Sequence, residues 1–122
     1  MSGTSSIIKV GSTLIVTISE EIGDNDAVAL QESINERIEQ TDARGLLMDI
    51  ASLETVDSFL GRLLNEIALG ARLLGAETVV SGMRPAVAMT LIELGLQLRG
   101  VSTALDSERG LAKLGVLVRE RS

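Results

Sequence analysis

The chain has 122 residues, 45% of them hydrophobic, which is enough for one domain with a hydrophobic core and too few for two. It contains neither His nor Cys, and this excludes disulfides, imidazole or thiolate metal ligands, and any Ser-His or Cys-His nucleophile pair. The formal net charge is −6, and an acidic chain without a basic stripe is poorly suited to bind nucleic acid.

The first third of the chain predicts a β-hairpin followed by a surface helix. Residues 7–10 and 13–18 are short β-rich runs separated by the two-residue turn Gly11-Ser12. A polar stretch then leads into a helix for which Asp24 or Asp26 is the predicted cap. This helix has an acidic outer face and one apolar stripe for the core, made of Ala27, Leu30, Ile34 and Ile38.

The middle of the chain predicts a buried strand and a long helix. Residues 45–50 form a compact apolar run, which is typical of a strand buried on both faces. After a loop over residues 51–57, a long helix is predicted to begin near Ser58 and to stop at Gly75. Its core stripe consists of Leu60, Leu63, Leu64, Ile67, Ala71 and Leu74.

The last third predicts two further strands, each followed by a helix. Residues 77–81 form a fourth strand, and residues 82–84 turn the chain. A short helix follows, with Pro85 at its first position and its end at Gly95. A fifth strand is expected over residues 101–105.

The two ends of the chain complete the predicted order of elements. Asp106 or Ser107 is predicted to cap a last helix that ends near Leu114. Residues 116–122 are then expected to form a charged tail, and residues 1–6 a flexible N-terminus. After the hairpin, strands alternate with helices, which favours a parallel sheet covered by helices. The predicted fold is α/β: a single domain with a mixed, mainly parallel five-stranded sheet, an N-terminal hairpin and four helices.

Ser58 is the candidate functional residue. In open α/β sheets function collects at the carboxyl ends of the strands, and Ser58 stands where the loop after the third strand meets the long helix. One interpretation is that its hydroxyl is simply the N-cap of that helix. The functional hypothesis is that Ser58 accepts a phosphate, which free backbone N–H groups and the helix dipole would stabilise.

None of the enzyme interpretations fits the residues present. Ser58 as a hydrolase nucleophile has no His base, and a Gly-x-Ser-x-Gly motif is absent. Asp49 has the strand-end position of a receiver-type phospho-aspartate. Such a site would also need an acidic pair after the first strand and a Lys at the end of the fifth. Here the acidic pair Glu20 and Glu21 follows the second strand, and the fifth strand does not end in Lys. A phosphate-binding glycine loop with Lys is also missing. We therefore expect no enzymatic activity, no cofactor and no metal.

Two apolar surfaces are unusual for a monomer. On the long helix, Phe59, Leu69 and Leu73 point roughly opposite to the core stripe, and the helix over residues 85–94 is apolar almost all round. Either a neighbouring segment covers these surfaces or they contact a second chain, and we expect a second chain. The candidate oligomer or partner surface comprises Leu69, Leu73, Met83, Arg84 and Pro85.

Charge and hydropathy constrain the partners and the location of the protein. Residues 1–57 carry eleven acidic and three basic side chains, a net charge of −8, whereas residues 58–122 carry six and eight, a net charge of +2. The acidic half suits a basic protein surface as partner. No apolar run reaches the ~18 residues of a membrane span, and residues 1–6 lack the pattern of a signal peptide, so we expect a cytoplasmic location without membrane contact.

These residues resemble the STAS domain of bacterial anti-sigma-factor antagonists. The resemblance covers residues 7–114 and rests on the alternation of elements, the length, and a serine after an aspartate at the start of the second helix. Two segments are most similar to the stressosome branch of that family, whose scaffold members consist of a bare STAS domain. These segments are Val56-Asp57-Ser58-Phe59 and residues 80–95, which include the pattern Pro-x-Val-Ala-x-Thr-Leu.

The resemblance implies a non-enzymatic signalling scaffold. Members of this branch co-assemble with larger sensor paralogues that carry a C-terminal STAS domain. They hold a serine/threonine switch kinase until phosphorylation releases it, which regulates an alternative sigma factor or another output, and a phosphatase resets them. The serine that matches Ser58 is the phosphorylation site, and Asp57 and Phe59 are its neighbours in partner recognition.

Two alternatives remain open. Simpler antagonists bind an anti-sigma kinase directly and carry Asp-Ser-Ser-Gly at the switch, whereas Phe59 and Leu60 follow the serine here. This departure favours the stressosome branch over the direct antagonist. The other alternative is a STAS module that senses a small molecule. In that case, binding of the ligand would raise the melting temperature of the domain.

Overall fold

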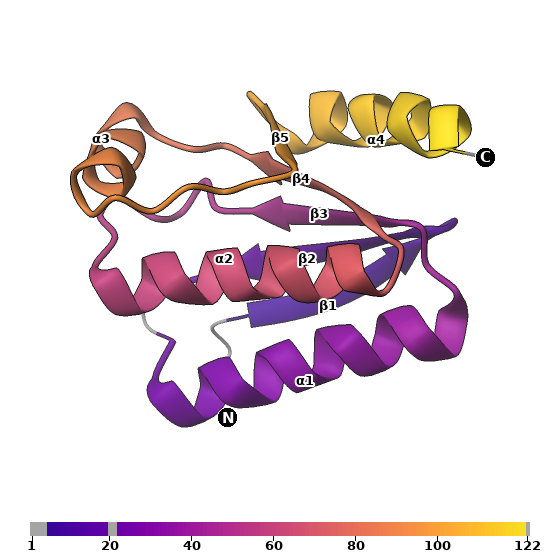
Figure 1. Cartoon of the computed structure of the whole chain (residues 1–122), viewed down its shortest axis with the longest axis horizontal. Coiled ribbons are helices and arrows are strands. Elements are labelled where there is room, and N and C mark those ends of the chain that lie inside the picture. The colour runs from indigo at the N-terminus through magenta and orange to yellow at the C-terminus, as the bar shows by residue number, and fades with distance from the viewer. Residues whose placement is uncertain (1–4, 20–21, 122) are drawn as a thin grey trace.

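The computed structural model describes residues 5–19 and 22–121, and these form a five-stranded sheet covered by four helices (Figure 1). The strand order is β1-β2-β3-β4-β5, with β1 antiparallel to β2 and the other neighbours parallel. This confirms the predicted α/β domain with its mixed, mainly parallel sheet. The strands are β1 (Ser5–Val10), β2 (Thr13–Ile18), β3 (Gly45–Asp49), β4 (Glu77–Ser81) and β5 (Val101–Ala104).

The helices cover the two faces of the sheet unequally. Helices α1 (Asp24–Thr41) and α2 (Ser58–Leu73) lie side by side on one face, and α4 (Ser107–Arg121) covers the other face over β3 and β4 (Figure 1). The short helix α3 (Pro85–Glu93) lies beside the end of the sheet where α2 begins (Figure 1). Within the described ranges, no helix is both long enough and apolar enough to cross a membrane.

The core consists of two layers separated by the sheet. Side chains of β3 alternate between them, with Leu46 and Met48 in the larger core beneath α1 and α2. Leu47 belongs to a smaller core that also contains Val79 and Leu114. The predicted strand that is buried on both faces is therefore confirmed.

The first two helices confirm the predicted core faces but not all of the predicted ends. The α1 stripe of Ala27, Leu30, Ile34 and Ile38 is buried as predicted. The predicted cap of α1 is wrong, because the N-cap is Gly23 and neither Asp24 nor Asp26 makes a side-chain cap hydrogen bond. Both aspartates lie in the first turn, where their charges favour the helix dipole. Leu74 is not a core residue, because α2 has already ended and Leu74 is 42% exposed.

The predicted charged tail is also wrong. Helix α4 does not end near Leu114 but continues to Arg121, because the partly buried Leu117 extends the apolar stripe that Leu111 and Leu114 begin. At the other end, β1 already includes Ser5, and the predicted flexible N-terminus otherwise lies outside the described residues.

Candidate functional site

The carboxyl-end edge of the sheet is built from three chain segments that hydrogen bonds connect. The amide of Ile50 donates to the Ser81 carbonyl at 3.0 Å, which continues the pairing of β3 and β4 into the loop. The Ser52 hydroxyl donates to the Ile18 carbonyl at 3.1 Å. The Arg84 Nε donates to the Ala51 carbonyl at 3.0 Å. The loop that precedes Ser58 is therefore fixed to the strands on both sides of it.

Gly82 permits the closest of these approaches. Its φ is +77°, a conformation that side chains disfavour. A Cβ at this position would lie 2.7 Å from the Cβ of Ala51 and 2.9 Å from its Cα. The turn from β4 toward α3 can therefore pack against the loop only with glycine at position 82.

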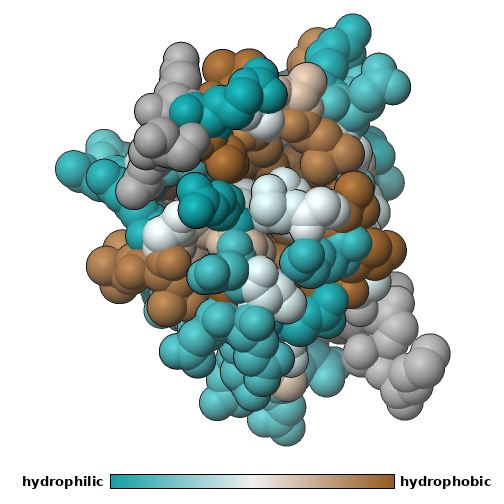
Figure 2. All heavy atoms as spheres, turned by 90° about the vertical axis from the view of Figure 1, so that its right-hand side faces the viewer, coloured by the Kyte–Doolittle hydropathy of each residue, from teal (hydrophilic) through white to brown (hydrophobic). Residues whose placement is uncertain are grey.

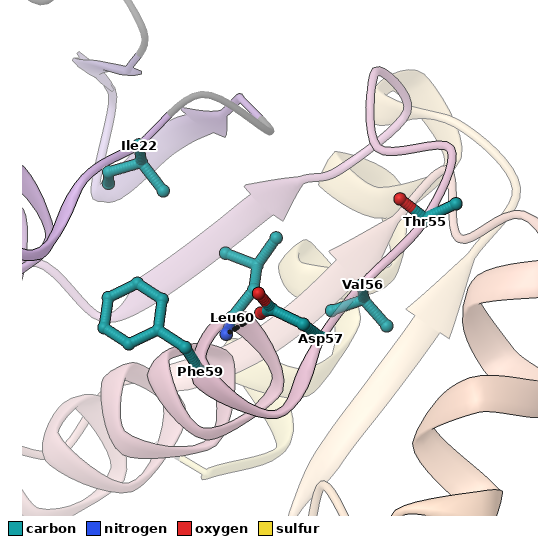
Figure 3. Close-up of a pocket in the computed structure, with 6 residues that line it drawn as sticks. All are labelled: Ile22, Thr55, Val56, Asp57, Phe59 and Leu60. Carbon is teal, nitrogen blue, oxygen red and sulfur yellow. Dashed lines mark hydrogen bonds between the residues drawn. The ribbon is translucent and has the colours of Figure 1, made fainter.

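The loop delivers Asp57, and not Ser58, to the cap position of α2. Asp57 has an extended backbone, and its Oδ1 accepts a hydrogen bond from the Leu60 amide at 2.8 Å (Figure 3). The prediction that the Ser58 hydroxyl is the N-cap is therefore wrong. Ser58 is the first residue of the helix, and the side chain before it performs the capping.

Asp57 as the cap leaves Ser58 available. Ser58 is exposed, and within the described ranges its hydroxyl has no hydrogen-bond partner. The Leu60 amide is bonded to the Asp57 carboxylate, and the Gly61 amide donates to the Asp57 carbonyl at 2.9 Å. The amides of Ser58 and Phe59 precede these and have no acceptor in the described part of the chain. An anionic group on Ser58 would thus lie beside two unused N–H donors at a helix N-terminus.

A small cavity of about 180 Å³ lies beside this turn. Figure 3 shows Ile22 and Phe59 on one side of it and Thr55 and Val56 on the other. Phe59 is 38% exposed although it is the only aromatic residue of the chain. The cavity is smaller than most ligand-binding pockets, so it is a hollow in the surface beside Ser58 and not a typical ligand site.

Asp49 is occupied by structural hydrogen bonds. Its Oδ1 accepts from the Ala51 amide at 3.0 Å, and its Oδ2 accepts from the Ser107 hydroxyl at 3.3 Å. These bonds hold the loop after β3 and the start of α4 against the end of the strand. Glu20 and Glu21, the acidic pair considered with Asp49, lie outside the described residues. Among the residues that the structure describes, no three acidic side chains cluster as metal ligands would.

The five residues of the predicted oligomer or partner surface do not form one surface. Arg84 is bonded to the loop before Ser58, and Met83 is partly buried against the larger core. Both lie with Pro85 at the start of α3, whereas Leu69 and Leu73 lie near the far end of α2 (Figure 1). The side chains of Leu69 and Leu73 are 55% and 78% exposed, as expected for residues opposite the core stripe.

Sequence reasoning missed a groove beside α2. It has a volume of about 600 Å³ and contains two arginines, Arg72 from α2 and Arg99 from the connection between α3 and β5. The helical spacing of Asn65, Leu69 and Arg72 places them on one side of α2. However, the sequence contains no signal for the position of the connection that forms the opposite wall.

A comparison with protein families identifies the family to which this domain belongs. The STAS domain model matches residues 5–106, and the chain belongs to the STAS domain family. The match extends over all five strands and the first three helices, and it includes the loop before Ser58.

Two solved structures resemble the chain over nearly its whole length. RsbS of Moorella thermoacetica, described as the S58E form, is 43% identical with a TM-score of 0.84, and the match covers 94% of this chain and 97% of that one. A chain from a structure described as the molecular architecture of the stressosome, a signal integration and transduction hub, is 44% identical with the same TM-score, covering 93% and 99%.

A curated relative is longer. The RsbT co-antagonist protein RsbRD of Bacillus subtilis is 30% identical over 106 residues, which are 87% of this chain and 38% of the relative. The chain thus spans less than half the length of this relative.

Proposed function

We propose that this chain is a signalling scaffold of a stressosome-type assembly, which holds a serine/threonine switch kinase and releases it when Ser58 is phosphorylated. The release would regulate an alternative sigma factor or another downstream output, and a phosphatase would restore the unmodified state. In this role the protein has no catalytic activity of its own. It assembles with further copies and with larger paralogues that carry a similar domain.

The main support for the proposal is that two different residues cap α2 and remain exposed at its start: Asp57 caps the helix, and Ser58 is exposed. Because the carboxylate of Asp57 bonds the Leu60 amide, the Ser58 hydroxyl is not needed to hold the helix. It is exposed, it belongs to the loop edge that three segments fix in place, and it lies beside the unused amides of Ser58 and Phe59. A kinase has access to it, and a phosphate there is compatible with the helix dipole.

The comparisons support the assembly part of the proposal. The similarity to RsbS of Moorella thermoacetica and to a chain of the stressosome structure extends over almost all of each chain, and this supports a role in such an assembly. The Moorella RsbS carries glutamate in place of a serine, a substitution that introduces a carboxylate as a partial counterpart of a phosphate. Three curated relatives are described as RsbT co-antagonist proteins, and we propose that the switch kinase held by this chain is a counterpart of RsbT.

Release is proposed to be electrostatic. A phosphoserine adds roughly −1.5 to −2 charges at neutral pH. The added charge would lie beside the Asp57 carboxylate and the exposed Phe59. Docking of the partner at this turn would then have to desolvate the phosphate next to a like charge, and this disfavours the contact. Phe59, which is exposed directly after Ser58, is the neighbouring apolar contact that we assign to the partner.

Phosphopeptide mass spectrometry after incubation with the cognate kinase and ATP tests the assignment. We expect phosphate on Ser58 and no modification of the Ser58→Ala variant. Thr55 and Thr90 serve as internal controls, because both are hydroxyl residues and the Thr90 hydroxyl already donates to the Ala86 carbonyl at 3.0 Å. Phosphate mainly on Thr55 or Thr90, with Ser58 unmodified, would end the proposal.

A further inference from the structure

Helix α2 presents an apolar ridge to solvent. The ridge consists of Leu69 and Leu73, which are 55% and 78% exposed. In Figure 2 a hydrophobic patch projects at the left margin, at the height that α2 has in Figure 1. Exposed leucines of this size at one end of a helix indicate a contact surface.

A basic groove follows one side of the ridge. It lies between α2 and the connection from α3 to β5, and it contains Arg72 and Arg99 together with the amide side chains of Asn65 and Gln97. The guanidinium of Arg72 lies against Gly100, since a Cβ at that glycine would be 2.5 Å from the Arg72 Nη1. Neither arginine forms an ion pair with another described residue.

An acidic groove follows the other side of the ridge. It lies between α1 and α2, has a volume of about 310 Å³, and is lined by Glu36 and Glu39 of α1 and by Leu73 and Leu74. Gly70 forms its floor, since a Cβ there would approach the Asn35 Oδ1 to 3.1 Å. Figure 1 shows the same order in space, with α2 between α1 and the connection to β5.

The order basic, apolar, acidic is complementary to a second copy of itself. We propose that a second copy of this chain docks on α2 about a twofold axis that runs along the ridge. This axis places the basic groove of each copy opposite the acidic groove of the other, so Arg72 faces Glu36 and Glu39 of its partner. Leu69 and Leu73 pack against the same residues of the second copy, which is the self-complementarity that a twofold contact requires.

The charges exclude the other twofold arrangement of the same surface. An axis in the contact plane but at right angles to α2 would place basic groove against basic groove and acidic against acidic. Like charges across an interface disfavour such a pairing. The two α2 helices of the dimer therefore run parallel and not antiparallel. This dimer face rests on the self-assembly that the proposed function includes and assigns a surface to it, although it involves neither Ser58 nor the kinase.

Single cysteines test the geometry directly, because the chain contains no Cys. We expect that Leu69→Cys and Leu73→Cys each form a disulfide-linked dimer on mild oxidation, since a parallel pair brings every ridge residue opposite its own copy. A disulfide requires a Cα–Cα separation below about 7 Å. Antiparallel helices would satisfy this at no more than one of the two positions, which lie about 6 Å apart along the helix. Ile92→Cys on α3, 76% exposed, is the control that should remain monomeric.

Charge reversal tests the partners across the axis. Arg72→Glu alone and Glu39→Arg alone should each weaken dimerisation about tenfold in sedimentation equilibrium, because each change makes two repulsive pairs. An equimolar mixture of the two variants should dimerise like the unmodified protein, since in the mixed dimer both contacts again join opposite charges. Glu32→Arg, on α1 but outside the groove, and Lys113→Glu on α4 are the matched controls.

The outcomes separate this inference from the proposed function. Efficient cross-linking at only one ridge position, equal cross-linking of Ile92→Cys, or no recovery in the mixture of Arg72→Glu and Glu39→Arg would each overturn the dimer. All variants lie on exposed side chains, so circular dichroism should show an unchanged fold. If Ser58 is phosphorylated but the ridge cysteines do not cross-link and the charge reversals leave self-association unchanged, the proposed function stands and the dimer surface falls. If the dimer forms but Ser58 is not a substrate, the reverse holds.

Discussion

Asp57 and Ser58 are neighbours at the start of α2 with different tasks. Asp57 stabilises the helix through the 2.8 Å hydrogen bond from the Leu60 amide, and Ser58 remains exposed. Asp57→Ala should lower the free energy of unfolding by roughly 0.5–2 kcal/mol, the usual range for loss of a side-chain cap. Ser58→Ala should change it by less than about 0.5 kcal/mol, as expected for an exposed residue without such a bond. Urea denaturation of both variants measures the difference.

Asp57→Asn is the matched control, because its amide oxygen can still accept the hydrogen bond from Leu60. It should keep most of the stability that Asp57→Ala loses. A larger loss in the free energy of unfolding for Ser58→Ala than for Asp57→Ala would mean that Ser58 is the cap. The Ser58 hydroxyl would then not be free to accept a phosphate.

Gly82 fixes the position of the turn beside the Ser58 loop. Gly82→Ala should destabilise the domain by about 1–3 kcal/mol, because the new Cβ meets Ala51 and the backbone has a φ of +77°. Gly23→Ala is the control, since that glycine has an ordinary φ of −88° and open space around its Cβ position. Thermal unfolding of both variants decides the point, and equal melting temperatures would contradict the packing described here.

At the scale of the elements, α4 is a structural helix and not a tail. Leu114 is 1% exposed and packs with Leu47 and Val79 on the second face of the sheet. Leu114→Ala should therefore cost about 2–5 kcal/mol in the free energy of unfolding, as for other buried leucines. Leu105→Ala, at a residue that is 78% exposed, should cost less than about 0.5 kcal/mol. Similar small losses for both would show that α4 does not cover the sheet.

The elements that the sequence predicted well are those with a strong hydrophobic period or an obligatory turn residue. Strand β4 has the predicted bounds, Pro85 begins α3 as expected, and Gly11 forms the hairpin turn with a φ of 59°. Helix ends were less predictable, because several polar residues compete for each cap and the backbone decides among them. Charged residues after Leu114 suggested a tail, yet the helix continues because its buried stripe continues.

At the scale of the whole molecule, the sequence located the edge of the candidate site but not its internal geometry. The order of strands and helices was sufficient to place Ser58 at the carboxyl ends of the strands. Which of two adjacent polar residues caps α2 depends on the backbone at Asp57, and this has no signature in a single sequence. The basic groove joins residues of α2 and of the connection to β5, so its two arginines become neighbours only in the folded chain.

The rigid surroundings of Ser58 in the folded molecule determine how phosphorylation acts. The loop before Ser58 is bonded to the strands on both sides, and the amides of Ser58 and Phe59 can donate hydrogen bonds to a phosphate without a change of the backbone. We therefore expect release of the kinase by charge and not by refolding. Ser58→Asp introduces one charge where a phosphate introduces nearly two, so its effect on kinase binding should be partial.

Release of the switch kinase can be followed through its affinity for the phosphorylated and the unmodified protein, measured together with amide hydrogen exchange in both forms. We expect phosphate on Ser58 to weaken kinase binding at least about tenfold, Ser58→Asp to weaken it less, and Ser58→Ala to keep the kinase bound. Exchange protection in the sheet should be the same in both forms. Unchanged kinase affinity after stoichiometric phosphorylation of Ser58 would contradict the switch, and loss of protection across the sheet would contradict its electrostatic mechanism.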